Sequence, residues 1–170
     1  MIALSKEMKD INHLSKEDFV DKFGFVFEHS PWVAGYAWNS RPFSSITELH
    51  QTMVEIVADA EKERKLELLR AHPDLGGKVN MTTESVKEQS GAGLDNLSPE
   101  EGQEFLKLNQ LYTDKFEFPF IIAVKGHNKD SIKAAMDERV NNDRDQELNT
   151  ALKEIYKIAR FRLEDLVETA

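Results

Sequence analysis

The sequence contains no cysteine, which excludes disulfide bonds, cysteine-ligated zinc and thiol catalysis. It also lacks a positive charge excess. The formal net charge is −9, which argues against nucleic-acid binding because phosphate recognition needs a basic surface. The longest purely apolar run, FPFIIAV, is far shorter than a membrane span. The first residues contain no apolar signal-peptide core and the last residues no receptor-read address, so we expect a soluble, cytoplasmic protein.

The overall composition is that of an ordinary globular protein, with 40% hydrophobic and 31% charged residues. A length of 170 residues suits one domain with one core, so we predict a single domain over residues 1–170. Ser15, Ser45 and Ser98 each stand three positions before an acidic residue, which is typical of a helix N-cap. Apolar spacing predicts helices after Ser15 (with Phe19, Phe23, Val26 and Phe27 on one face), after Ser45, over about 61–71, after Thr82 or Thr83, and over about 98–115, 129–141 and 143–168.

One segment breaks this helical pattern. Residues 118–124, FPFIIAV, have the composition and length of a strand, but no second strand is evident to pair with them. We therefore predict an all-α, bundle-like fold with one short buried extended segment between helices. The backbone groups of such a segment need partners outside any helix, and a polar ligand is one candidate.

A His-Pro pair interrupts the stretch LLRAHPDLGGK, residues 68–78. Pro73 disfavours α geometry at the preceding residue, so a helix should end at or near His72. The imidazole would then lie at the negative end of the helix dipole, where it can serve as a general acid or base near neutral pH. The alternative is a histidine that only caps the last carbonyls, and this fragment alone favours that alternative.

The segment SVKEQ provides a second candidate. Ser85, Glu88 and Gln89 are separated by three or four positions, so they can share one face of a helix. Their side chains together can hydrogen-bond an amide-rich ligand. The alternative is a solvated polar face, which is the commoner arrangement on a charged helix.

The last predicted helix carries an arginine on its apolar side. Arg162 lies between Ala159 and Leu166 on the inward stripe, whereas Arg160 lies well round the helix. An arginine in an apolar setting is costly unless it is paired or receives an anion. Periodicity supports two interpretations equally: a ligand-binding arginine, and an ion pair with a buried acidic residue such as Glu28.

Other classes of site have little support. The five histidines include no pair at H-x-x-x-H spacing, so no metal site is predicted. The sequence contains no nucleophile elbow, P-loop or dinucleotide-binding motif. We interpret the aromatic stretch WVAGYAW, residues 32–38, as core or dimer surface.

Several motifs nevertheless occur in the order of one known family. They are H-P-D-L-G-G from His72, S-x-x-E-Q-x-x-A-G-L from Ser85, F-P-F-I-I-A-V-K-G from Phe118 and I-A-R-F-R-L from Ile158, preceded by E-H-S-P-W at 28–32 and R-P-F at 41–43. Over about residues 14–167 the sequence resembles OHCU decarboxylase. The resemblance implies an all-α homodimer without metal or organic cofactor. It also implies a small-molecule substrate, 2-oxo-4-hydroxy-4-carboxy-5-ureidoimidazoline, converted to (S)-allantoin in urate degradation.

The resemblance also implies roles for individual residues. His72 and Glu88 match the catalytic histidine and glutamate of the family. The stretch between them looks short compared with many relatives, which leaves the loop 76–81 undefined. Which of the two protonates the intermediate does not follow from the sequence. The matched substrate contacts are Pro73, Ser85 and Gln89, the backbone of Ile121, Ile122 and Ala123, and Arg162 rather than Arg160.

Two alternative functions remain open at this point. A ureide-pathway hydrolase acting one step earlier would need an activated water, for which the sequence shows no obvious constellation. A non-catalytic helical interaction domain would use the surface of residues 32–38. Relatives of this domain sometimes occur fused to urate oxidase, so the chain is also compatible with a domain excised from such a fusion.

Overall fold

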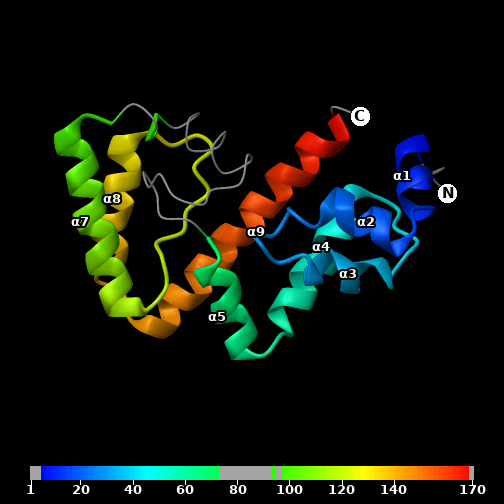
Figure 1. Cartoon of the computed structure of the whole chain (residues 1–170), viewed down its shortest axis with the longest axis horizontal. Coiled ribbons are helices and arrows are strands. Elements are labelled where there is room, and N and C mark those ends of the chain that lie inside the picture. The colour runs from blue at the N-terminus through cyan, green and yellow to red at the C-terminus, as the bar shows by residue number, and fades with distance from the viewer. Residues whose placement is uncertain (1–4, 73–92, 95–96, 169–170) are drawn as a thin grey trace. The chain divides into compact units, whose positions relative to one another are not determined.

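The computed structural model describes residues 5–72, 93–94 and 97–168 (Figure 1). The chain divides into two compact units: unit 1 is Met1–Leu68 with Tyr156–Ala170, and unit 2 is Leu69–Ile155. Within the described residues the regular structure is α-helical, apart from the 3-10 residue Leu94, and no strand occurs. The all-α prediction is therefore confirmed, whereas the single domain over 1–170 stays a prediction.

Unit 1 is built from short helices, three of which begin with a serine cap. Helix α3 packs against both α2 and α4. The side chains of Ser5, Ser15 and Ser45 each accept a hydrogen bond from a backbone N–H in the first turn of α1, α2 and α4. The helices are α1 Lys6–Asn12, α2 Lys16–Phe23, α3 Trp32–Trp38, α4 Ile46–Ala58, most of α5 Lys62–Arg70 and the end of α9 Arg144–Glu168.

The predicted helix after Ser15 is shorter than its apolar spacing suggested. Helix α2 ends at Phe23, so the prediction that Val26 and Phe27 continue it was wrong. At the C-cap, the Gly24 N–H donates to the carbonyl of Val20, and a Cβ on Gly24 would lie 2.5 Å from that same oxygen. Val26 and Phe27 are nevertheless buried, each with 1% exposure.

Unit 2 contains α7 Pro99–Phe116, α8 Lys129–Arg139 and the first part of α9. A capping box starts α7: the Ser98 hydroxyl accepts from the Glu101 N–H, and the Glu101 carboxylate accepts from the Ser98 N–H. Helices α7 and α8 pack together. An ion pair of 2.7 Å between Lys129 and Glu101 joins them. The helices predicted over about 98–115, 129–141 and 143–168 are confirmed, with ends shifted by at most two residues at each boundary.

The segment between α7 and α8 is the predicted exception to helical structure. Residues 118–124 lie in no helix and no strand, and all are buried. Aromatic packing holds the start of the segment on α7: the rings of Tyr112 and Phe120 meet edge to face at 5.3 Å. The prediction of a short buried segment between two helices is confirmed.

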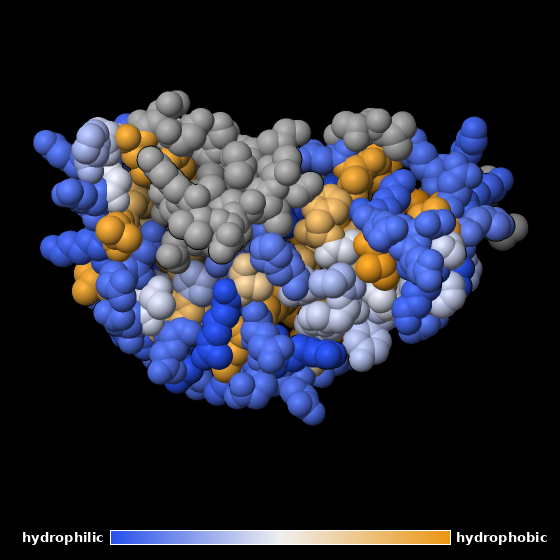
Figure 2. Space-filling model, viewed as in Figure 1, coloured by the Kyte–Doolittle hydropathy of each residue, from blue (hydrophilic) through white to orange (hydrophobic). Residues whose placement is uncertain are grey.

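The face drawn in Figure 2 is largely hydrophilic, with apolar residues scattered over it. Among the residues that the structure describes, the exposed large hydrophobic ones are Leu106 (67%), Tyr36 (53%) and Leu111 (51%). Of the helices that the structure describes, none is both long and apolar enough to cross a membrane.

Candidate functional site

The structure places His72 just beyond the end of α5. The helix ends at Arg70, and the His72 N–H then donates to the Leu69 carbonyl at 3.2 Å in a turn. The predicted end of the helix near this His-Pro pair is confirmed. His72 is 9% exposed, so this residue is buried within unit 2.

Four predicted site residues lie outside the described part of the chain: Pro73, Ser85, Glu88 and Gln89. The predicted short helix after Thr82 or Thr83 lies there too. Their shared face and their roles therefore stay predictions.

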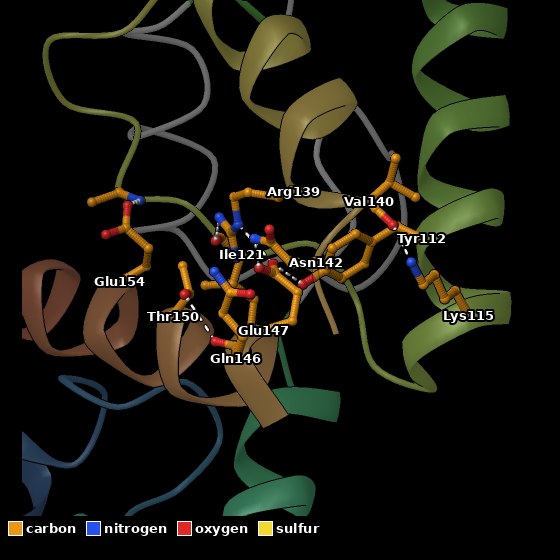
Figure 3. A network of polar contacts seen from close by, with 11 residues as sticks. Tyr112, Lys115, Ile121, Arg139, Val140, Asn142, Gln146, Glu147, Thr150 and Glu154 are labelled. Atoms are coloured by element: carbon orange, nitrogen blue, oxygen red, sulfur yellow. Dashed lines mark hydrogen bonds and ion pairs between the residues drawn. The ribbon is translucent and has the colours of Figure 1, made fainter. Parts of the chain in front are cut away.

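Two backbone groups of the predicted ligand-contacting segment are bonded to side chains of unit 2 (Figure 3). The carbonyl of Ile121 accepts a hydrogen bond from Arg139 Nη1 at 2.7 Å. The N–H of Ala123 donates to Glu154 Oε1 at 3.2 Å. Within the described residues, no hydrogen bond involves the backbone of Ile122, which lies between them.

Arg139 belongs to a buried polar network at the junction of α8 and α9. Its Nε donates to Oε1 of the fully buried Glu147 at 2.7 Å. The Tyr112 hydroxyl donates to the same oxygen at 2.5 Å, and Asn142 Nδ2 donates to the other oxygen at 3.0 Å. The Arg139 guanidinium also lies 4.3 Å from the centroid of the Phe120 ring. The charge on Glu147 is therefore matched by one cation and two neutral donors.

The phenol in this network is held in its protonated form. Burial raises the pKa of Tyr112 well above its usual value, and the hydrogen bond to Glu147 raises it further. Tyr112 therefore acts as a hydrogen-bond donor, and not as an anion, throughout the physiological pH range.

Sequence reasoning missed this network, although two spacings point to it. Arg139 follows Ile132 by seven positions and Met136 by three, so it lies on the inward face of α8. Glu147 precedes Ala151 by four positions on α9. Charged residues on apolar faces of neighbouring helices are a detectable signal for a buried ion pair.

In unit 1, Arg162 is 3% exposed and forms a buried ion pair. Its Nη2 lies 2.8 Å from Oε2 of Glu28, which is fully buried, and its Nη1 donates to the Phe25 carbonyl at 2.9 Å. The ion pair that the sequence offered as one of two readings is present. A ligand contact for Arg162 stays a prediction.

Arg160 has a different environment on the same helix. Its Nε pairs with Glu164 at 2.8 Å, and its Nη1 donates to the Thr47 hydroxyl at 3.0 Å. About a third of its side chain is exposed. The prediction that Arg160 lies off the buried stripe is confirmed.

A metal centre can be assessed for the described residues only. Among them, no three histidine, aspartate or glutamate side chains gather closely enough to hold a metal ion.

The comparisons with known proteins agree on one family. The OHCU decarboxylase family matches residues 12–164 of the sequence. The chain belongs to the OHCU decarboxylase family. It is 50% identical over 159 residues to 2-oxo-4-hydroxy-4-carboxy-5-ureidoimidazoline decarboxylase of Halalkalicoccus jeotgali, which covers 94% of this chain and 90% of that protein.

Two further relatives extend this family assignment. A uric acid degradation bifunctional protein of Bacillus subtilis is 46% identical, over 94% of this chain but only 32% of its own length. A crystal structure of OHCU decarboxylase in the presence of (S)-allantoin superposes with a TM-score of 0.69 and 30% identity, covering 81% of this chain and 91% of that one. The OHCU decarboxylase fold is therefore shared across most of the chain.

Proposed function

We propose that this protein decarboxylates 2-oxo-4-hydroxy-4-carboxy-5-ureidoimidazoline to (S)-allantoin, acting on a small molecule in urate degradation as a single domain over residues 1–170. The observation that carries the proposal is the 50% identity, over 94% of the chain, to an OHCU decarboxylase. Membership of that family makes the protein a carboxy-lyase. The (S)-allantoin named with the related crystal structure supports the product.

The chemistry requires little from the protein beyond positioning and proton transfer. Breaking the bond to CO2 leaves an electron pair on the former carboxyl-bearing carbon. The adjacent imidazoline C=N of the substrate accepts that pair, which leaves an enol at the hydroxyl-bearing carbon. The hydroxyl then loses its proton to become the carbonyl, and a proton delivered to one face of the ureido-bearing carbon gives a single enantiomer. We therefore propose a cofactor-independent reaction, because the substrate supplies its own electron acceptor.

In this proposal His72 handles the substrate hydroxyl or carboxylate and relays a proton. Burial of its imidazole supports that role, since a water-excluded group transfers protons to substrate and not to solvent. Glu88 is the second catalytic residue and holds the ureido and ring nitrogens together with Gln89. Pro73 and Ser85 are neighbouring contacts, Ile121, Ile122 and Ala123 offer backbone groups, and Arg162 anchors an anionic or carbonyl group.

The state of the protein in the cell is part of the same proposal. We propose a homodimer, as the family resemblance implies, in the cytoplasm. We also propose covalent fusion to, or cooperation with, urate oxidase. The bifunctional uric acid degradation protein of Bacillus subtilis, of which this chain covers 32%, supports the fusion of such a domain to another activity of the pathway. Light scattering on the purified protein tests the oligomeric state.

A stereochemical assay tests the activity. The substrate is generated fresh from urate, and circular dichroism follows the allantoin formed with and without the protein. We expect faster formation of optically active (S)-allantoin with the wild-type protein, and no such acceleration with His72→Asn. Spontaneous, racemic product at the uncatalysed rate would contradict the proposal and favour a non-catalytic domain, whereas faster loss of the preceding metabolite alone would favour a hydrolase.

A further inference from the structure

We propose that Arg139 and Glu154 are positioning residues that hold the segment 121–123 so that the backbone of Ile122 faces the substrate. The inference rests on the proposed function, because it concerns the segment expected to contact the substrate. It goes further by assigning a role to two side chains that belong neither to the predicted catalytic pair nor to the predicted contacts.

The two side chains bind the same edge of the segment. Arg139 on α8 donates to the carbonyl of Ile121, and Glu154 on α9 accepts from the N–H of Ala123. In an extended chain, residues two apart direct their backbone groups to one edge, and the residue between them directs its own groups to the opposite edge. The extended conformation that the sequence predicts for this segment would therefore direct the N–H and C=O of Ile122 to the edge opposite the groups bound by Arg139 and Glu154.

Ile122 is therefore the residue of the segment whose backbone groups suit a ligand. Ile122 is 7% exposed, and within the described residues no hydrogen bond involves its backbone N–H or C=O. A buried peptide group requires a partner, and a ureide offers both N–H donors and C=O acceptors. A ligand with paired donors and acceptors can bond to both groups of one residue at once.

The Arg139 side chain that holds the Ile121 carbonyl is itself fixed by hydrogen bonds. Glu147 holds the Nε of Arg139, and Tyr112 and Asn142 in turn hold the carboxylate of Glu147 (Figure 3). A planar guanidinium can bond in two directions at once, to Glu147 with one nitrogen and to Ile121 with another, which a lysine ammonium cannot reproduce in the same geometry. The network therefore transmits the position of α8 and α9 to the segment's backbone.

Substitutions of Glu154 give the sharper experiment. Glu154 is only half-buried, so its variants are expected to fold, and a matched set of variants exists. Glu154→Met removes the acceptor for the Ala123 N–H, whereas Glu154→Gln retains an acceptor oxygen at the same length. Lys153→Gln changes an exposed neighbour on the same helix and serves as the control for surface charge. For each variant we would measure kcat and KM by circular dichroism, amide exchange of residues 122 and 123, and the melting temperature.

We expect Glu154→Met to lower kcat/KM by about tenfold or more, since misplacing a contact by a fraction of an ångström is enough for such a loss. We expect faster amide exchange at Ala123 in the same variant, and restoration of both quantities in Glu154→Gln. A folded Glu154→Met protein with wild-type kcat/KM would overturn the proposal. Equal impairment of Glu154→Met and Glu154→Gln would also overturn it, because the charge and not the acceptor would then matter.

Arg139→Lys gives an independent test should Glu154→Met fail to fold. It retains the positive charge beside Glu147 but loses the planar fork, so we expect a similar fall in kcat/KM, and an unchanged kcat/KM in a folded protein would overturn the proposal. The failure of the proposed function gives a different result: the wild-type protein itself would then show no stereoselective turnover. In that case amide exchange still decides whether these side chains fix the segment.

Discussion

The two units each contain a buried arginine paired with a fully buried glutamate, and the pairs join very different parts of the chain. In unit 1, Arg162 and Glu28 lie 134 positions apart, so the pair ties the last helix to the turn after α2. In unit 2, Arg139 and Glu147 lie eight positions apart and connect consecutive helices. Each arginine also donates to a backbone carbonyl, of Phe25 and Ile121 respectively.

This difference bears on what each pair does. A pair distant in sequence can form only when the unit is assembled, so its loss should lower the stability of the whole of unit 1. A pair between consecutive helices can form early, and its arginine directs one remaining nitrogen to a segment expected to bind the substrate. Buried ion pairs rarely stabilise a protein more than apolar residues of the same size would, so their value lies in the geometry they impose.

The largest expected effect is that of Arg162→Met. Removing the guanidinium leaves the buried carboxylate of Glu28 without its 2.8 Å ion pair, which should cost roughly 3–5 kcal/mol of the free energy of unfolding. Urea melts without ligand measure it. The double variant Arg162→Met with Glu28→Gln should recover a large part of the loss, because it removes the buried negative charge together with the positive one.

Arg160→Met is the matched control for this prediction. Arg160 lies two positions away and pairs with Glu164 near the surface, so its removal should cost less than about 1 kcal/mol. If Arg162→Met were as stable as the wild type, the pair with Glu28 would be incidental and Arg162 would be maintained for a ligand. Equal losses in both variants would instead point to a general effect of charge on α9.

A smaller effect is expected for Arg139→Met in unit 2. Glu147 loses its cation but retains the hydrogen bonds from Tyr112 and Asn142, which continue to stabilise its charge. We expect a loss of about 2 kcal/mol in the free energy of unfolding, again from urea melts. A loss as large as that of Arg162→Met would show that the two neutral donors contribute little to stabilising Glu147. In that case Tyr112→Phe would hardly change the free energy of unfolding.

Much of the fold could be predicted from local chemistry. Serine caps before acidic residues and apolar residues at helical spacing located α2, α4 and α7, because both signals act within one or two turns of helix. Helices α1 and α3 were not predicted. Each is only seven residues long, too short for periodicity to separate a helix from an apolar turn.

The site could be predicted only in part, and for a related reason. The end of α5 near His72 follows from the neighbouring proline, a local steric effect. Periodicity can show that Arg139 and Arg162 lie on the inward faces of their helices. It cannot identify Glu147 and Glu28 as their partners, because those contacts depend on tertiary packing. The hydrogen bonds to Ile121 and Ala123 had no sequence signal, since any residue type supplies the same backbone groups.

The smallest predicted effect is a difference between the two units in how their stability depends on pH. In unit 1, burial lowers the pKa of His50 below its usual 6.5, and nearby Arg160 lowers it further, against the opposing effects of the Tyr156 carbonyl and Glu164. In unit 2, ion pairing with Lys129 lowers the pKa of Glu101 to about 2. The unfolded chain binds a proton at His50 more readily than the folded one, so this contribution is complete above pH 6.5 and is lost as the pH falls toward the lower, folded pKa.

Glu101 contributes in a lower window, lost only as the pH falls from about 4.5 toward 2. Acidification from pH 7.5 to 5.5 should therefore weaken unit 1 before unit 2, by less than about 1 kcal/mol because His50 is only half-buried. His50→Gln should remove this part of the pH dependence, since glutamine does not titrate yet can still donate to the Tyr156 carbonyl, which the ring nitrogen contacts at 2.8 Å. Urea melts of both proteins at the two pH values measure it, and identical pH dependence would show that His50 does not set it.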